Sequence, residues 1–125
     1  MSGVYTNRSS GFMRDDRERL LDMLEAIRKI EQIVYSEKYT ERLQNDELIE
    51  VWVIHHLQII GEAASRLSKE FKEKHSGVAW GSIIGMRHVL VHGYFETDTE
   101  IVWKVVEKDL PDLKKQLGTI WAEQA

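Results

Sequence analysis

The segment Gly85–Phe95 combines apolar residues with side chains that can do chemistry, namely Arg87, His88, His92 and Tyr94. Arginine presents a fork of N–H donors that matches phosphate oxygens. Histidine gives or takes a proton near neutral pH. On a helix, the five-residue step from Arg87 to His92 turns through about 140°, so the two side chains do not share one face. The arginine must bend toward a shared cleft, or a symmetric second copy must supply the rest of the site.

Cleavage of RNA needs little more than these groups. The 2′-hydroxyl attacks the neighbouring phosphorus, a base removes its proton, an acid protonates the leaving 5′-oxygen, and a cation stabilises the crowded phosphate. The nucleophile belongs to the substrate, so we predict neither a metal nor another cofactor. His92 is expected near a helix C-terminus, where the helix dipole favours the imidazolium form. This suits a general acid or a phosphate-binding group.

The same residues are also compatible with roles outside catalysis. Arg87 can simply pair with Glu62, with His92 a capped surface residue. His88 and His92 are four residues apart, the spacing of a helical metal pair, but this segment offers no third ligand. Glu62 is flanked by apolar residues and is therefore expected to be partly buried and to need a partner. We favour an ion pair that orients Arg87 over a direct catalytic role for Glu62.

Packing is the expected role of the remaining histidines and tryptophans. His55 and His56 are adjacent and point about 100° apart on a helix, so packing or a hydrogen bond is predicted for them. The tryptophans are expected to anchor the core or an interface rather than to stack on bases. They are Trp52, Trp80, Trp103 and Trp121.

Apolar residues recur at steps of three and four, which predicts helices. Asp46 is a plausible N-cap. Pro111 is expected to kink or break the last helix, with Asp109 able to cap a restart. The expected helices span about 15–35, 46–74, 80–92 and 98–121, and their short connections predict an antiparallel bundle.

The second expected helix carries two stripes and an internal glycine. One stripe is apolar. The second stripe is mixed and is expected to face an interface or a cleft; it runs through Leu48, Trp52, His55, Ile59, Glu62 and Arg66. Gly61 costs about 1 kcal/mol relative to alanine in a helix interior. The close approach of a neighbouring helix would explain its presence.

The bulk composition limits the function classes. A chain of 125 residues fits one domain. We expect a flexible tail at 1–13 and a helical domain at 14–125. The absence of cysteine excludes disulfides and a thiol nucleophile, and no apolar run reaches the roughly 18 residues that span a bilayer. These features predict a cytoplasmic protein. With a formal net charge of −4, an RNA site must be a local positive pocket rather than a basic face.

From Leu20 to Leu117 the chain resembles the HepT family of HEPN ribonuclease toxins. The HEPN signature is an arginine followed after four to six residues by a histidine, and Arg87 and His92 match it with four residues between them. The HepT form adds a tyrosine two residues after the histidine, which Tyr94 matches. The flanking matches are Ile60-Gly-Glu-Ala63, Trp80, Gly85-Met-Arg87, His92-Gly-Tyr-Phe95, Ile101-Val-Trp103 and Asp109-Leu-Pro111. The resemblance implies an all-α, antiparallel four-helix bundle with a short or kinked C-terminal helix, and a homodimer.

The resemblance also implies a function. It suggests the toxin of a type VII-like toxin–antitoxin system, an endoribonuclease with Arg87 and His92 as catalytic residues. A MntA-like nucleotidyltransferase antitoxin would transfer AMP to Tyr94 and inactivate the toxin, and the two proteins can form a larger hetero-oligomer. His88 stands where the family often has a polar residue such as asparagine, which leaves its role open. The alternatives are a non-catalytic HEPN scaffold that binds a nucleotidyltransferase or a nucleotide, and a plain structural bundle.

Overall fold

The computed structural model describes residues 14–34, 46–92 and 99–124. For residues 14, 88–92, 99–100 and 124 it describes the helical backbone alone. All regular elements in these ranges are helical, which confirms the all-α prediction. The predicted tail at 1–13 and Tyr94 lie outside the described residues. Within those ranges, every helix is too short or too polar to cross a membrane.

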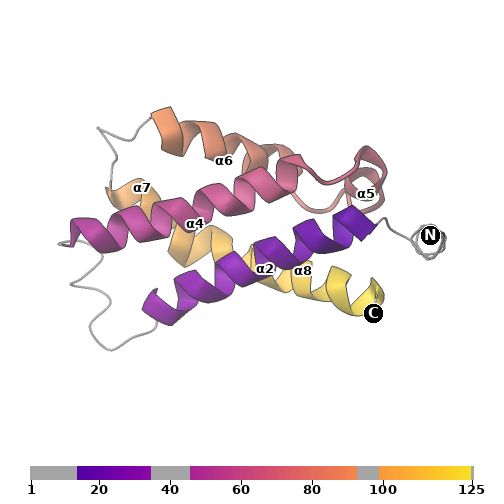
Figure 1. Cartoon of the computed structure of the whole chain (residues 1–125), viewed down its shortest axis with the longest axis horizontal. Coiled ribbons are helices and arrows are strands. Elements are labelled where there is room, and N and C mark those ends of the chain that lie inside the picture. The colour runs from indigo at the N-terminus through magenta and orange to yellow at the C-terminus, as the bar shows by residue number, and fades with distance from the viewer. Residues whose placement is uncertain (1–13, 35–45, 93–98, 125) are drawn as a thin grey trace, which may run out of the picture.

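Four longer helices account for most of the described chain (Figure 1). Helix α4 packs against both α2 and α6. Helix α6 returns along α4 in the opposite direction, and α8 lies against α2 (Figure 1). The elements are α2 (Arg14–Val34), α4 (Glu47–Ser65), α5 (Lys69–Lys74), α6 (Trp80–His92), α7 (Thr99–Lys104), the π-helical segment η3 (Val105–Asp109) and α8 (Leu110–Gln124).

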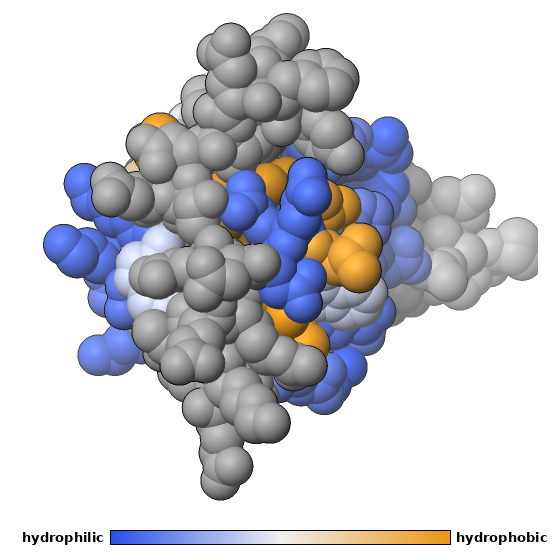
Figure 2. Space-filling model, turned by 90° about the vertical axis from the view of Figure 1, so that its left-hand side faces the viewer, coloured by the Kyte–Doolittle hydropathy of each residue, from blue (hydrophilic) through white to orange (hydrophobic). Residues whose placement is uncertain are grey.

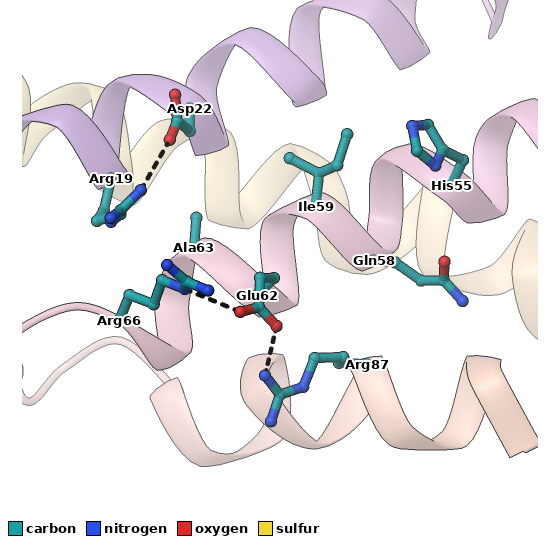
Figure 3. Close-up of a pocket in the computed structure, with 9 residues that line it drawn as sticks. All are labelled: Arg19, Asp22, His55, Gln58, Ile59, Glu62, Ala63, Arg66 and Arg87. Carbon is teal, nitrogen blue, oxygen red and sulfur yellow. Dashed lines mark hydrogen bonds and ion pairs between the residues drawn. The ribbon is translucent and has the colours of Figure 1, made fainter.

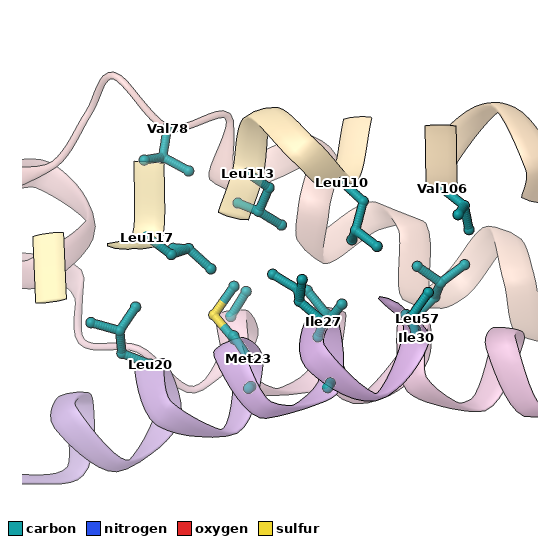
Figure 4. Packing of buried hydrophobic residues seen from close by; sticks show 14 of the residues in the cluster. Leu20, Met23, Ile27, Ile30, Leu57, Val78, Val106, Leu110, Leu113 and Leu117 are labelled. Atoms are coloured by element: carbon teal, nitrogen blue, oxygen red, sulfur yellow. The ribbon is translucent and has the colours of Figure 1, made fainter. Parts of the chain in front are cut away.

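The core fills the space between α2, α4 and the C-terminal helices (Figure 4). On α2, Leu20, Met23 and Ile30 are fully buried. The predicted apolar stripe of the second helix is buried from Val53 to Phe71. This burial sets how α4 is rotated and leaves its mixed stripe on the outside, where the functional residues lie.

The prediction of one helix over 46–74 is wrong. Helix α4 ends at Ser65, and α5 begins after Ser68, whose side chain accepts a hydrogen bond from the Phe71 backbone N–H as an N-cap. Asp16 of α2 is buried and accepts hydrogen bonds from the Ser68 backbone N–H at 2.7 Å and from Ser68 Oγ at 2.6 Å. This tertiary contact favours a chain break over a continuous helix.

A kink or a break was predicted at Pro111, with Asp109 able to cap a restart; the chain does not break there but stays helical from α7 through η3 into α8. The Leu110 backbone N–H donates to the Val105 carbonyl, five residues back, so the turn before the proline is π-helical. A proline ring clashes with the carbonyl four residues earlier in a regular α-helix, and the wider π turn relieves this crowding. Asp109 therefore lies inside η3 rather than at an N-cap.

Candidate active site

A groove with a volume of about 420 Å³ lies over the outward face of α4, between α2 and α6 (Figure 3). Most of the predicted mixed stripe of α4 lines it, as expected for a cleft. The lining residues come from three helices and one helix cap: Arg19 and Asp22 from α2; His55, Gln58, Ile59, Glu62 and Ala63 from α4; Arg66, the C-cap of α4; and Arg87 from α6.

Arg87 reaches into this groove from α6 and is held by α4. Its Nη1 donates to Glu62 Oε1 at 2.6 Å and to Ser65 Oγ at 3.2 Å. Ser65 Oγ in turn donates to the Glu62 backbone carbonyl at 2.6 Å. The ion pair expected between Glu62 and Arg87 is therefore present, and two side chains one helical turn apart direct the guanidinium.

Glu62 also binds a second arginine. Its other carboxylate oxygen, Oε2, accepts a hydrogen bond from Arg66 Nε at 2.9 Å. The hydrogen bond from Arg87, followed by the one from Arg66, lowers the pKa of Glu62 below its ordinary value. The carboxylate is therefore ionised at neutral pH and joins two guanidinium groups at the centre of the groove (Figure 3). Glu62 is partly buried, as predicted, with its side chain 45% exposed.

Gly61 explains how α6 comes so close. A β-carbon built on Gly61 would lie 2.9 Å from the Arg87 β-carbon and 3.1 Å from the Ile83 carbonyl oxygen. The predicted close approach of a neighbouring helix is confirmed, and the helix concerned is the one that carries Arg87.

The other half of the Arg/His motif is described only as backbone. His92 is the last residue of α6. Because α6 runs antiparallel to α4 (Figure 1), this end points toward the N-terminal half of α4. The side chains of His88 and His92, and all of Tyr94, lie outside what the structure describes, so their predicted roles stay predictions.

The charge of the groove differs in sign from that of the whole protein. Three arginines and two carboxylates line it, which gives a formal charge of +1 with histidine neutral, whereas the whole chain carries −4. This agrees with the prediction that an RNA site in an acidic chain must be a local positive pocket. Among the described residues, no group of three or more His, Asp or Glu side chains is placed to hold a metal ion.

The sequence analysis missed one residue that lines the groove, Arg19, and one that holds Arg87 in it, Ser65. Ser65 was not considered, although its position one turn after Gly61 and Glu62 puts it on the same side of the helix. Arg19 gave no signal, because an exposed arginine on an amphipathic helix is usually a solvated charge. Only the packing of α2 on α4 brings it to the groove.

The packing roles predicted for the other aromatic and histidine residues are partly confirmed. His56 is buried and its Nδ1 donates to the Trp52 carbonyl oxygen at 2.8 Å; burial lowers its pKa. His55 is exposed and lines the groove. Trp80 is a core residue whose Nε1 donates to the His75 carbonyl oxygen at 3.0 Å, whereas Trp52 is 43% exposed.

Comparison with known proteins points to one family. A family model described as "Ribonuclease HepT-like" matches residues 23–120. The chain is 36% identical over 107 residues to "Putative RNase MJ1380" of Methanocaldococcus jannaschii, covering 86% of this chain and 97% of that protein. It is 37% identical over 101 residues to "Probable ribonuclease HepT" of Thermococcus cleftensis, covering 81% of this chain and 91% of that protein. No solved structure matches the chain. The extent of these matches shows that the chain belongs to the HepT-like ribonuclease family.

Proposed function

We propose that this protein is a metal-independent endoribonuclease that acts as the toxin of a type VII-like toxin–antitoxin system. The ribose 2′-oxygen attacks the adjacent phosphorus while the P–O5′ bond breaks, leaving a 2′,3′-cyclic phosphate and a 5′-hydroxyl. One proton leaves the 2′-hydroxyl and one is taken up by the 5′-oxygen; His92 carries out one of these transfers as general base or general acid, and solvent water carries out the other. Arg87 binds the phosphate oxygens and stabilises the charge that builds up on them.

The observation that carries this proposal is the way Arg87 is held. Glu62 and Ser65 bind one nitrogen of its guanidinium, and Gly61 lets α6 approach. A guanidinium oriented before substrate arrives loses less side-chain freedom when it binds a phosphate. The groove around it is locally positive, as an RNA site in an acidic protein must be.

A homodimer would complete the site. Arg87 and His92 are about 140° apart around α6, so one protomer does not present both on one face. Toward the His92 end of α6, large apolar side chains are exposed: Leu48 by 80%, Val51 by 40%, Trp52 by 43% and Ile101 by 50%. Figure 2 views this end of the molecule and shows apolar surface amid polar surface. We assign this surface to a second copy related by a twofold axis, within the four-helix bundle arrangement of the HEPN fold.

Regulation would act at Tyr94. A MntA-like nucleotidyltransferase would join the tyrosine oxygen to the α-phosphorus of ATP, with pyrophosphate leaving, so that each transfer adds one AMP. The added phosphate is negative and would repel the RNA backbone beside the cleft. The antitoxin is then both the binding partner and the modifying enzyme of this protein.

The decisive experiment measures RNA cleavage by the purified parent, Arg87→Ala and His92→Ala proteins, with light scattering and circular dichroism as checks on assembly and fold. Both variants are expected to lose cleavage while remaining folded. Cleavage at the parent rate by either variant would contradict the assignment. EDTA is expected to leave the rate unchanged; loss in EDTA with recovery on adding a divalent ion would support a His88/His92 metal pair instead.

A mixing experiment tests the shared site. Arg87→Ala and His92→Ala proteins, unfolded and refolded together, form dimers that keep one intact arginine and one intact histidine at the seam. Cleavage is expected to recover partly in the mixture and to stay absent in either protein alone.

Leu48→Glu should shift the parent from dimer to monomer. If expression of the protein alone leaves bacterial growth unchanged, and the purified protein does not cleave RNA, the non-catalytic scaffold is the better description.

A further inference from the structure

The groove extends beyond Arg87, on the side away from the His92 end of α6. Along α4 the lining residues follow one another from His55 to Arg66, and Arg87 is anchored at Glu62, near the Arg66 end (Figure 3). The reaction proposed above takes place between Arg87 and the His92 end. Arg66 and Arg19 therefore lie outside the reacting centre, yet in the same continuous groove.

These two arginines come from different helices and converge on one place. Arg66 Nε is bound to Glu62, and its side chain is 58% exposed, so that its guanidinium is accessible from the groove. Arg19 pairs with Asp22 at 3.7 Å, with the arginine side chain 32% exposed and the aspartate side chain 52% exposed. Exposed ion pairs of this kind are weak, and a phosphate can compete with a carboxylate for a guanidinium because both offer paired oxygens.

We propose that Arg66 and Arg19 bind the RNA backbone next to the scissile phosphate, so that the groove holds a run of phosphates rather than a single one. The inference rests on the proposed function, because it takes RNA as the substrate. The ligand is taken to be a single-stranded segment, because proteins commonly hold single strands in a positively charged groove that follows the phosphate backbone. Arg66 and Arg87 bind the two oxygens of one carboxylate, so Arg66 lies next to a phosphate that is bound at Arg87.

Salt dependence separates a phosphate contact from an indirect effect. For single strands, the logarithm of the binding constant falls with the logarithm of salt concentration by about 0.7 for each phosphate that is neutralised. The probe is a short 2′-O-methyl RNA of mixed sequence, which cannot be cleaved because its nucleophile is blocked. Binding is followed by fluorescence anisotropy over a series of salt concentrations, with parent protein and variants in their assembled state.

Arg66→Ala and Arg19→Ala are each expected to weaken binding several-fold and to reduce the salt slope by about 0.7. Arg66→Lys should restore most of that slope. The matched control is Arg28→Ala: Arg28 lies on α2 in a similar exposed pair with Glu25 at 3.8 Å, outside the groove lining. Arg28→Ala removes one positive charge, as the two test variants do. It is expected to leave the RNA affinity, the salt slope of binding and the rate of cleavage unchanged.

Three results would overturn the proposal. The first is a parent slope retained in both Arg66→Ala and Arg19→Ala. The second is weaker binding without a change in slope, which would mean that Arg66 acts only through Glu62 on Arg87. The third is a parent protein that does not bind the RNA even at low salt but binds an acidic protein through these arginines. Binding with the expected slopes but no cleavage of ordinary RNA would refute the nuclease and leave this inference standing.

Discussion

Gly61 lies directly beneath Arg87: a β-carbon on the glycine would come within 2.9 Å of the β-carbon of the arginine. The other nearby atoms belong to the backbone of α6, the Ile83 carbonyl oxygen at 3.1 Å and the Arg87 nitrogen at 3.3 Å. A helix backbone cannot yield as a flexible side chain can, so the spacing between α4 and α6 depends on glycine at this position.

Replacing Gly61 with alanine is therefore expected to push α6 outward and to displace Arg87. Overpacking of this kind costs about 1–3 kcal/mol in the free energy of unfolding, and a displacement of about 1 Å in a reacting group can cost about 100-fold in rate. Thermal denaturation and single-turnover cleavage measure the two effects. Gly118→Ala is the control: it lies in α8, with nothing within 4 Å of a β-carbon, and should gain about 0.5–1 kcal/mol.

Glu62 is expected to act by holding Arg87 in position. Glu62→Ala should lower kcat at least about 10-fold with a smaller change in KM, because the guanidinium loses its anchor but the groove remains. Glu62→Gln keeps an oxygen that accepts a hydrogen bond and should retain intermediate activity. Glu73→Ala removes an exposed partner of Lys69 on α5 and should behave like the parent. Equal activity of Glu62→Ala and parent would exclude the positioning role.

The contact between Asp16 and Ser68 is expected to stabilise the break between α4 and α5. Ser68→Ala removes a hydrogen-bond donor to a buried carboxylate and an N-cap, at a cost of about 1–3 kcal/mol. Chemical denaturation of Ser68→Ala, Asp16→Ala and the double variant tests this. The losses should be less than additive in the double variant. The exposed Ser82→Ala should stay within about 0.5 kcal/mol of the parent.

Stability should fall as the solution becomes mildly acidic, because two histidines have lowered pKa values in the fold. Burial is the largest cause for both His56 and His75. Below the unfolded pKa of about 6.5 the unfolded state takes up protons that the folded state resists, so the free energy of unfolding decreases as pH falls. Denaturation at neutral pH and in mild acid measures this slope. His56→Gln should flatten it partly, leaving the His75 contribution; an unchanged slope would contradict the assignment.

Local patterns in the sequence predicted several of the features that matter for function. The apolar periodicity predicted α6 with the bounds that it has, Trp80–His92. Gly61 in a helix interior predicted a close approach, and a carboxylate at Glu62 among apolar neighbours predicted a partner. These predictions succeeded because each depends on a local cost, a missing side chain or an unpaired charge, that the fold must compensate somewhere.

Features that depend on residues far apart in the chain were decided only by the tertiary structure. The break between α4 and α5 lies where Asp16 binds Ser68, across 52 positions of sequence. The apolar stripe continues past this break to Phe71, so the local pattern predicted one uninterrupted helix. Arg19 joins the groove because α2 packs on α4, and Ser65 binds Arg87 because α6 lies against the same face. Burial of one face of each helix fixes the rotation of that helix, and this rotation determines which polar residues meet on the outside.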